Sequence, residues 1–150
     1  MKRHKKQNIG SISHGTMRPE DLIPSFIWEL KAQTPTKRSH LKLIREIEPR
    51  LNEEEYYDSE DSQSDLEDLF DALDCYTLPY FYFGAHPGDG SDYGFWLSES
   101  FQDDFDGLKI NDTSEVPKGF SGDVLLVNDH GNMTLYSYSH GRSRIVWEIV

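Results

Sequence analysis

Apolar residues in the first half of the chain recur at intervals of three and four positions. Over residues 19–32 this spacing places the apolar side chains on one face of a helix, and Pro19 followed by two acids marks its first turn. A second stripe over residues 39–51 predicts another amphipathic helix that ends near Pro49. We expect the two helices to form a hairpin.

The helical spacing stops after residue 51 and returns at residue 65. Residues 52–64 show no period, which predicts an acidic loop in solvent, and the basic residues 1–15 are expected to form a flexible tail. A third helix is predicted over residues 65–74, with its polar positions mostly acidic. One face of that helix is therefore anionic. Its apolar positions are Leu66, Leu69, Phe70 and Leu73.

After Cys75 the alternation of apolar and polar residues becomes that of strands, broken by turn-rich strings such as AHPGDGS (85–91). Helices followed by strands predict an α+β fold, with the N-terminal helices packed on one face of a C-terminal antiparallel sheet of about five strands. Residues 1–150 are expected to form a single domain. The predicted strands are 77–84, 92–98, 123–128, 132–139 and 143–150. The predicted core is Leu22, Phe26, Leu30, Leu43, Ile44, Ile47, Leu69, Leu73, Phe81, Phe83, Phe95, Leu125, Val127, Leu135, Ile145 and Trp147.

The formal charge of −12 is concentrated in one part of the chain. Residues 52–74 hold eleven Asp or Glu and no Lys or Arg, whereas residues 1–50 carry a net charge of +6 and residues 75–150 one of −7. An acidic total opposes non-specific attraction to nucleic acid or to anionic lipid. A cationic protein surface is the natural complement, and the absence of a catalytic signature beside the acidic block favours binding over catalysis.

Cysteine usage and hydropathy restrict the compartment. Cys75 is the single cysteine, so neither an intrachain disulfide nor a Cys-based zinc site is possible, which suits a reducing cytoplasm. The basic start lacks the apolar stretch of a secretory signal, and no apolar run is long enough to span a membrane. We therefore expect a cytoplasmic protein of a bacterial cell without a membrane or a cofactor as partner.

Paired tyrosines inside the acidic run point to an interface. A solvated spacer has little use for Tyr56 and Tyr57, and tyrosine is enriched where proteins bind each other. Carboxylates beside them would give orientation and a fast on-rate against a basic partner. The predicted partner-binding residues are Glu53, Glu54, Glu55, Tyr56, Tyr57, Asp58, Glu60, Asp61, Asp65, Glu67, Asp68 and Asp71.

The string HPGDGSD is the densest set of potential acid/base groups or metal ligands in the chain. It supplies His86, Asp89 and Asp92, to which Asp129 with His130, or His140, could add from neighbouring turns. The spacing matches no standard metal motif, and polar residues are common in solvated turns. We therefore predict structural turns and no metal site, and keep a metal-dependent enzyme as an alternative. The glycines of this string also lack the pattern of a phosphate-binding loop.

Two further motifs occur near the N-terminus. His14-Gly15-Thr16 is similar to a tripeptide of ADP-ribosyltransferases, which place this histidine against the nicotinamide ribose, but the Tyr and Glu of such a site cannot be assigned convincingly to Tyr93 and Glu148. The second motif is a basic arm of a type that contacts phosphates, although such tails more often aid solubility. It comprises Lys2, Arg3, Lys5 and Lys6.

Three strings resemble those of small uncharacterised acidic proteins of bacterial phages, prophages and plasmids. They are GSISHGTMRPEDLIP (10–24), YFGAHPGDGSDYGFW (82–96) and GDVLLVNDHGNMTLY (122–136). The resemblance implies no catalytic residue. It implies an inhibitor of host defence, such as an anti-CRISPR protein, whose carboxylates stand in for DNA phosphates on a nucleic-acid-binding protein. The alternative is a toxin-neutralising immunity protein, because such proteins are similar to this chain in fold class.

Overall fold

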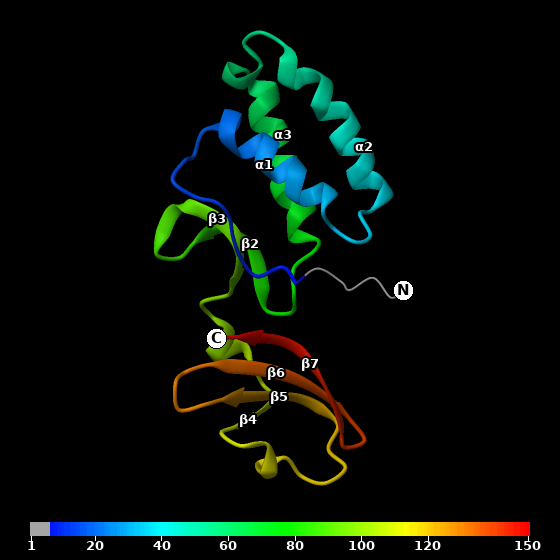
Figure 1. Cartoon of the computed structure of the whole chain (residues 1–150), viewed down its shortest axis with the longest axis vertical. Coiled ribbons are helices and arrows are strands. Elements are labelled where there is room, and N and C mark those ends of the chain that lie inside the picture. The colour runs from blue at the N-terminus through cyan, green and yellow to red at the C-terminus, as the bar shows by residue number, and fades with distance from the viewer. Residues whose placement is uncertain (1–6) are drawn as a thin grey trace. The chain divides into compact units, whose positions relative to one another are not determined.

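The computed structural model describes residues 7–150, so the basic residues Lys2, Arg3, Lys5 and Lys6 lie outside it. Contacts divide the chain into two compact units, residues 1–99 and residues 100–150 (Figure 1). The α+β class is confirmed. The described strands form two sheets, of three and of four strands, rather than one sheet of about five, and one strand precedes the helices. The prediction of a single domain stays a prediction.

The helices of the N-terminal unit follow the apolar spacing. The first two helices match their predicted ranges within a few residues, but the third begins at Glu60 instead of Asp65. Residues 52–64 are therefore not one loop. The elements are α1 (Pro19–Lys31), α2 (Arg38–Ile47), the 3-10 helices η1 (Glu48–Asn52) and η2 (Tyr56–Asp58), and α3 (Glu60–Asp74).

The sheet of this unit has the order β1-β3-β2 and is antiparallel throughout. The strand β1 lies within the predicted flexible tail, so that prediction is wrong for these residues. Its backbone comes so close to β3 that a Cβ on Gly94 would lie 2.2 Å from the carbonyl oxygen of Gly10. The hydroxyl of Ser11 also donates to the carboxylate of Asp92. The strands are β1 (Gly10–Ser13), β2 (Phe81–His86) and β3 (Asp89–Leu97).

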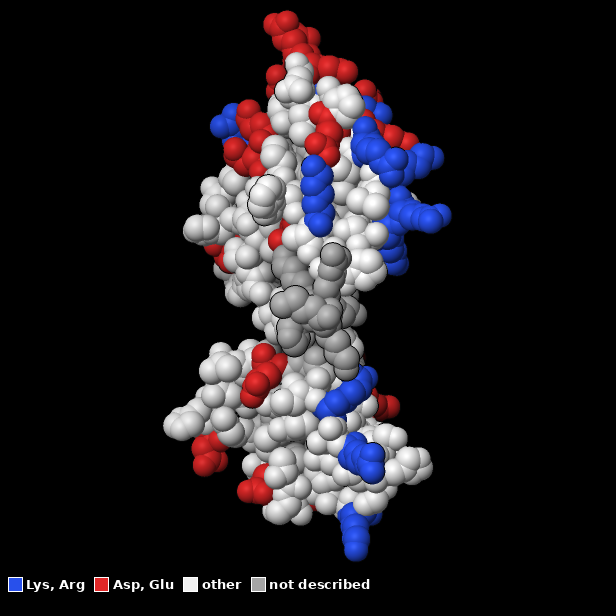
Figure 2. Space-filling view, turned by 45° about the vertical axis from the view of Figure 1, so that its right-hand side comes forward, with Lys and Arg blue, Asp and Glu red and all other residues white. Residues whose placement is uncertain are grey.

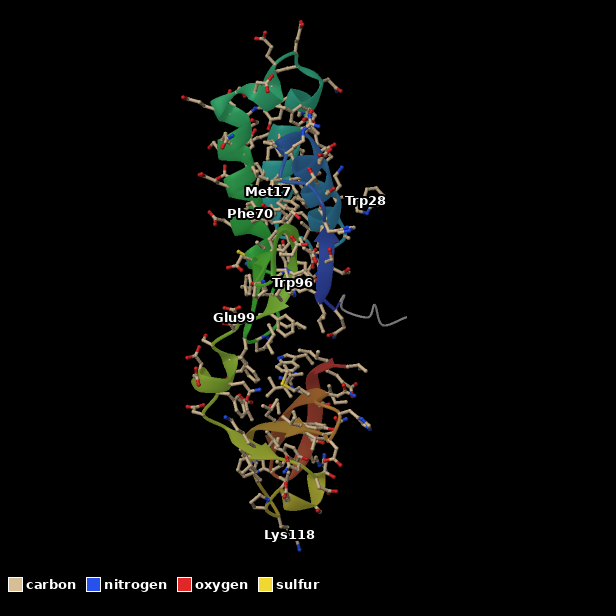
Figure 3. All side chains as sticks on the ribbon, turned by 90° about the vertical axis from the view of Figure 1, so that its left-hand side faces the viewer. Met17, Trp28, Phe70, Trp96, Glu99 and Lys118 are labelled. Atoms are coloured by element: carbon tan, nitrogen blue, oxygen red, sulfur yellow. The ribbon has the colours of Figure 1, made fainter. Side chains whose placement is uncertain are left out.

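Aromatic rings join the helices to the sheet. The Phe26 ring of α1 meets Phe70 of α3 edge-on at 5.0 Å, Phe83 of β2 at 5.1 Å and Tyr93 of β3 at 6.1 Å. Such pairs add about 0.5–1.5 kcal/mol each beyond the burial of their area. Phe70 points inward in Figure 3, whereas Trp28 of α1 points outward and is 77% exposed. These rings hold α3, which carries the acidic face, against a rigid support.

The C-terminal unit is a four-stranded sheet of order β4-β5-β6-β7. The last three strands pair antiparallel with one another, as predicted, but β4 pairs in parallel with β5 and lies outside the predicted strands. Trp147 packs against Phe101 at 5.5 Å. The elements are α4 (Phe101–Asp104), β4 (Leu108–Ile110), η3 (Thr113–Glu115), β5 (Gly122–Val127), β6 (Met133–Ser139) and β7 (Arg142–Ile149).

Most of the predicted core is buried, with three exceptions. Leu43 and Val127 are half-buried, and Ile145 is 55% exposed. The register explains the last error: Leu135 pairs with Trp147, but its neighbour Tyr136 pairs with Ile145. One extra residue in β7 therefore reverses the alternation of inward and outward positions, as β-bulges do.

Over residues 7–150 no helix is long and apolar enough to cross a membrane.

Candidate functional site

The acidic segment is anchored by three side chains that we call the Asp65 frame: Arg50, Tyr56 and Asp65. One guanidinium nitrogen of Arg50 donates to both carboxylate oxygens of Asp65 at 2.9 Å, and the Tyr56 hydroxyl donates to Oδ2 at 2.6 Å. Asp65 is 6% and Tyr56 4% exposed. A buried carboxylate is tolerated when it is paired and hydrogen-bonded in this way. The frame therefore connects η1, η2 and α3.

The frame also shifts the pKa of its members. Burial, and then the hydrogen bond to Asp65, raise the pKa of Tyr56 far above its ordinary value, so its hydroxyl stays a donor. The pKa of Arg50 is raised chiefly by its hydrogen bond to Asp65. Both shifts favour the protonated forms of Tyr56 and Arg50, which are the forms that donate to Asp65.

Two serines start α3 earlier than predicted. Ser59 is the N-cap, and its side chain accepts from the backbone N–H of Ser62 at 3.3 Å. The buried Ser62 hydroxyl donates to the carbonyl oxygens of Ser59 at 2.8 Å and Tyr57 at 3.1 Å. Glu60 and Asp61 occupy the first turn, where negative charge is favourable. The acidic residues are thus part of ordered structure.

Six carboxylates gather at this end of the unit, and we call them the acidic rim: Glu53, Glu54, Glu55, Asp58, Glu60 and Asp61. All six are exposed, and all but Glu60 line an open hollow of about 460 Å³ together with Tyr56 and Ser59. Figure 2 shows acidic side chains crowded at the top of this unit. Over residues 7–150 no ion pair reaches the rim, because the neighbouring Arg50 is engaged by Asp65. The rim is therefore a concentrated negative surface that no salt bridge of the described residues neutralises.

The other predicted partner-binding residues fall in different places. Glu67, Asp68 and Asp71 are exposed along α3, beyond the rim. Tyr56 does not present its ring to a partner in this structure, because the ring is buried and the hydroxyl donates to Asp65. Tyr57 is half-buried and meets the Tyr56 ring edge-on at 5.1 Å. Asp65 points into the unit as well.

Sequence reasoning missed the supporting residues. Nothing local in the sequence marks Arg50, because its partner Asp65 lies fifteen positions later. Ser59 had a usable signal, because a serine followed by two acids is a typical helix start. Applied at residue 59, that signal predicts the observed beginning of α3.

The string HPGDGSD forms a tight hairpin turn. His86 Nδ1 accepts from the backbone N–H of Gly88 at 2.9 Å, and the Asp89 carboxylate accepts from the backbone N–H and the hydroxyl of Ser91. These two hydrogen bonds, followed by smaller effects of His14 and His86, lower the pKa of Asp89. Over residues 7–150 no three His, Cys, Asp or Glu side chains group as a metal site.

The residues named with the enzyme alternatives are distributed over both units. His14 follows β1, and Tyr93 is buried among the aromatic rings of the core. Glu148 lies in β7, where its carboxylate accepts from the Thr134 hydroxyl at 3.4 Å. Asn128 Oδ1 accepts from the backbone N–H of His130, and Ser121 Oγ from that of His140. The contacts of His130 and His140 belong to turns.

Comparison with known proteins gives no relative: no family, curated protein or solved structure matches this chain.

Proposed function

We propose that this chain is a binding protein whose acidic rim docks on a basic, nucleic-acid-binding surface of another protein. The observation that carries the proposal is the Asp65 frame, which holds in place an acidic rim of six exposed carboxylates, five of which line one hollow. A rigid surface loses less conformational entropy on binding than a disordered acidic loop would. The partner is expected to belong to a bacterial defence complex, in line with the resemblance to proteins of mobile elements.

The frame and the rim have separate tasks in this proposal. The rim side chains project into solvent and their charge speeds association with a cationic surface, an effect that falls as salt is added. The frame carboxylate is turned inward and does not meet the partner. Neutralising rim residues should therefore weaken binding without unfolding the protein.

The test uses two variants with the same change of charge. The rim variant is Glu53→Gln/Glu54→Gln/Glu55→Gln, and the control is Asp103→Asn/Asp106→Asn/Asp129→Asn in the other unit, whose side chains are also exposed. Each serves as bait in a bacterial lysate, and captured proteins are identified by mass spectrometry. We expect a nucleic-acid-binding protein with the wild type and the control, and its loss with the rim variant.

Binding to the purified partner then decides the mechanism. The rim variant should associate roughly tenfold more slowly or worse, while the control matches the wild type. DNA or RNA should compete with the wild type for the partner. Equal binding by both variants, without competition, would overturn the proposal. A captured toxin domain that nucleic acid does not displace would favour the immunity-protein alternative instead.

A further inference from the structure

A groove runs between α2 and α3, outside the acidic rim, and stripes of opposite charge on the two helices flank it. Its volume is about 360 Å³, and it is open to solvent. Leu43 and Ala72 give it an apolar strip, and the exposed Cys75 lies at its edge. The remaining lining residues are Ser39, His40, Lys42, Glu46, Asp68 and Asp71.

A basic stripe of α2 flanks the groove, and Lys42 is its member that lines the groove. Arg38, Lys42 and Arg45 are exposed and follow one another at intervals of four and three positions, which places them on one stripe of the helix. Glu46 is the one acid that lines this wall, and it pairs loosely with Lys42 at 3.9 Å. Figure 2 shows Lys and Arg side chains gathered down the side of the unit where α2 lies.

The α3 wall is acidic. Glu67, Asp68 and Asp71 are exposed on this helix at intervals of one and three positions. Within the part of the chain that the structure describes, no ion pair crosses the groove between them and the basic stripe. Within the described residues Lys42 is the one member of either stripe that has an ion-pair partner, Glu46, so most of the charge of both stripes is left unpaired by the chain itself.

We propose that the groove binds a second copy of this chain, in a two-fold symmetric dimer. A surface with a basic stripe beside an acidic stripe is complementary to itself after a half-turn, because each stripe then meets its opposite in the other copy. Two-fold interfaces are self-complementary in this sense. The half-buried Leu43 lies between the stripes and is covered by the same contact, whereas Ala72 beside it is already buried within the unit. This dimer leaves the acidic rim free.

Charge reversal tests the pairing. One variant is Arg38→Glu/Lys42→Glu and the other is Asp68→Lys/Asp71→Lys. The change at Arg38 adds negative charge near a helix N-terminus and the change at Asp71 adds positive charge near a helix C-terminus, so both suit the helix dipole. Circular dichroism and thermal melting check that each variant folds. A matched control, Arg142→Glu/Arg144→Glu, makes the same change as the first variant on the C-terminal unit.

Sedimentation velocity reads out the mass. The wild type and the control should sediment at twice the chain mass of 17.4 kDa, and each groove variant alone at the single mass. An equimolar mixture of the two groove variants should recover the dimer, because both of its stripe contacts are again between opposite charges. A monomeric wild type at its highest soluble concentration, or groove variants that remain dimeric, would overturn the proposal.

Cys75 locates the interface independently. It is the single thiol and lies at the groove, so a second copy should shield it from a maleimide reagent. We expect its reaction rate to fall as wild-type concentration rises, and to stay constant in each groove variant. A rate in the wild type that does not depend on concentration, although the protein is dimeric, would place the contact elsewhere and overturn the assignment. The dimer and the proposed function are tested by different variants, so a negative result here does not bear on the experiment with the rim variant.

Discussion

The carboxylate of Asp74 accepts a hydrogen bond from the backbone N–H of Phe83 across 3.0 Å. Asp74 ends α3, and Phe83 lies in β2, an edge strand of the three-stranded sheet. Negative charge at a helix C-terminus is unfavourable by itself, because the helix dipole is negative there. The bond to the strand offsets that cost and ties the acidic helix to the sheet.

Replacing Asp74 with Ala should lower the free energy of unfolding by about 1–3 kcal/mol, because the partly buried N–H of Phe83 loses its acceptor. Urea denaturation followed by tryptophan fluorescence measures the change. Asp58→Ala, on the exposed rim, is the control and should alter stability by no more than about 0.5 kcal/mol. Equal effects of the two substitutions would show that the bond to Phe83 is not stabilising.

Tyr56→Phe should destabilise the protein by about 1.5–3 kcal/mol, because the buried carboxylate of Asp65 loses one of its hydrogen-bond donors. Tyr57→Phe is the matched control in the adjacent position, with an expected effect below about 0.5 kcal/mol. The same urea titration compares both. A Tyr56→Phe variant as stable as the wild type would mean that Arg50 alone satisfies Asp65.

The raised pKa of Tyr56 predicts a loss of stability in alkali. Above about pH 10 the unfolded chain releases this proton while the folded chain retains it, so the folded state binds more protons and stability falls as pH rises. Tyr56→Phe lacks this contribution. The difference in unfolding free energy between wild type and variant should be constant below about pH 9 and narrow above about pH 10. Urea midpoints measured across this range test it, and a constant difference up to pH 11 would contradict the prediction.

Gly94→Ala should displace β1. A Cβ there would lie 2.2 Å from the Gly10 carbonyl oxygen and 2.8 Å from the Cα of Ser11, so the strand must move or detach. We expect a loss of about 1–3 kcal/mol and faster amide hydrogen exchange in β1. Gly90→Ala, in the same strand with no atom within 4 Å of the added carbon, is the control. Unchanged exchange in β1 would contradict the close approach.

Periodicity predicted the parts of the fold that depend on it. The helices from Pro19 and Arg38 and the final meander follow apolar spacing, because each buries one face. The strand β1 has no such alternation. It is ordered by backbone pairing with Gly94 and by the bond from Ser11 to Asp92, which are contacts between residues about eighty positions apart. Local patterns cannot reveal contacts of this kind.

The sequence predicts the negative charge of the candidate site, but it does not predict which of its side chains point inward. That the rim acids are exposed follows from their density, since so many carboxylates cannot all be buried. Asp65 and Tyr56 are of the same residue types as their neighbours, yet they turn inward because Arg50 meets them there. Asp65 is the buried acid of the block because Arg50, which belongs to η1, pairs with it.

The separation between the Asp65 frame and the acidic rim has a consequence for how such a chain changes over time. The frame fixes the backbone through Arg50, Tyr56 and Asp65, whereas Glu53, Glu54, Glu55 and Asp58 make no side-chain contact that the fold needs within the described residues. Substitutions at these four positions can accumulate or be selected without refolding the protein. Neighbouring residues of one short segment therefore differ in how freely they can be replaced: the inward ones are constrained by stability, and the outward ones are not.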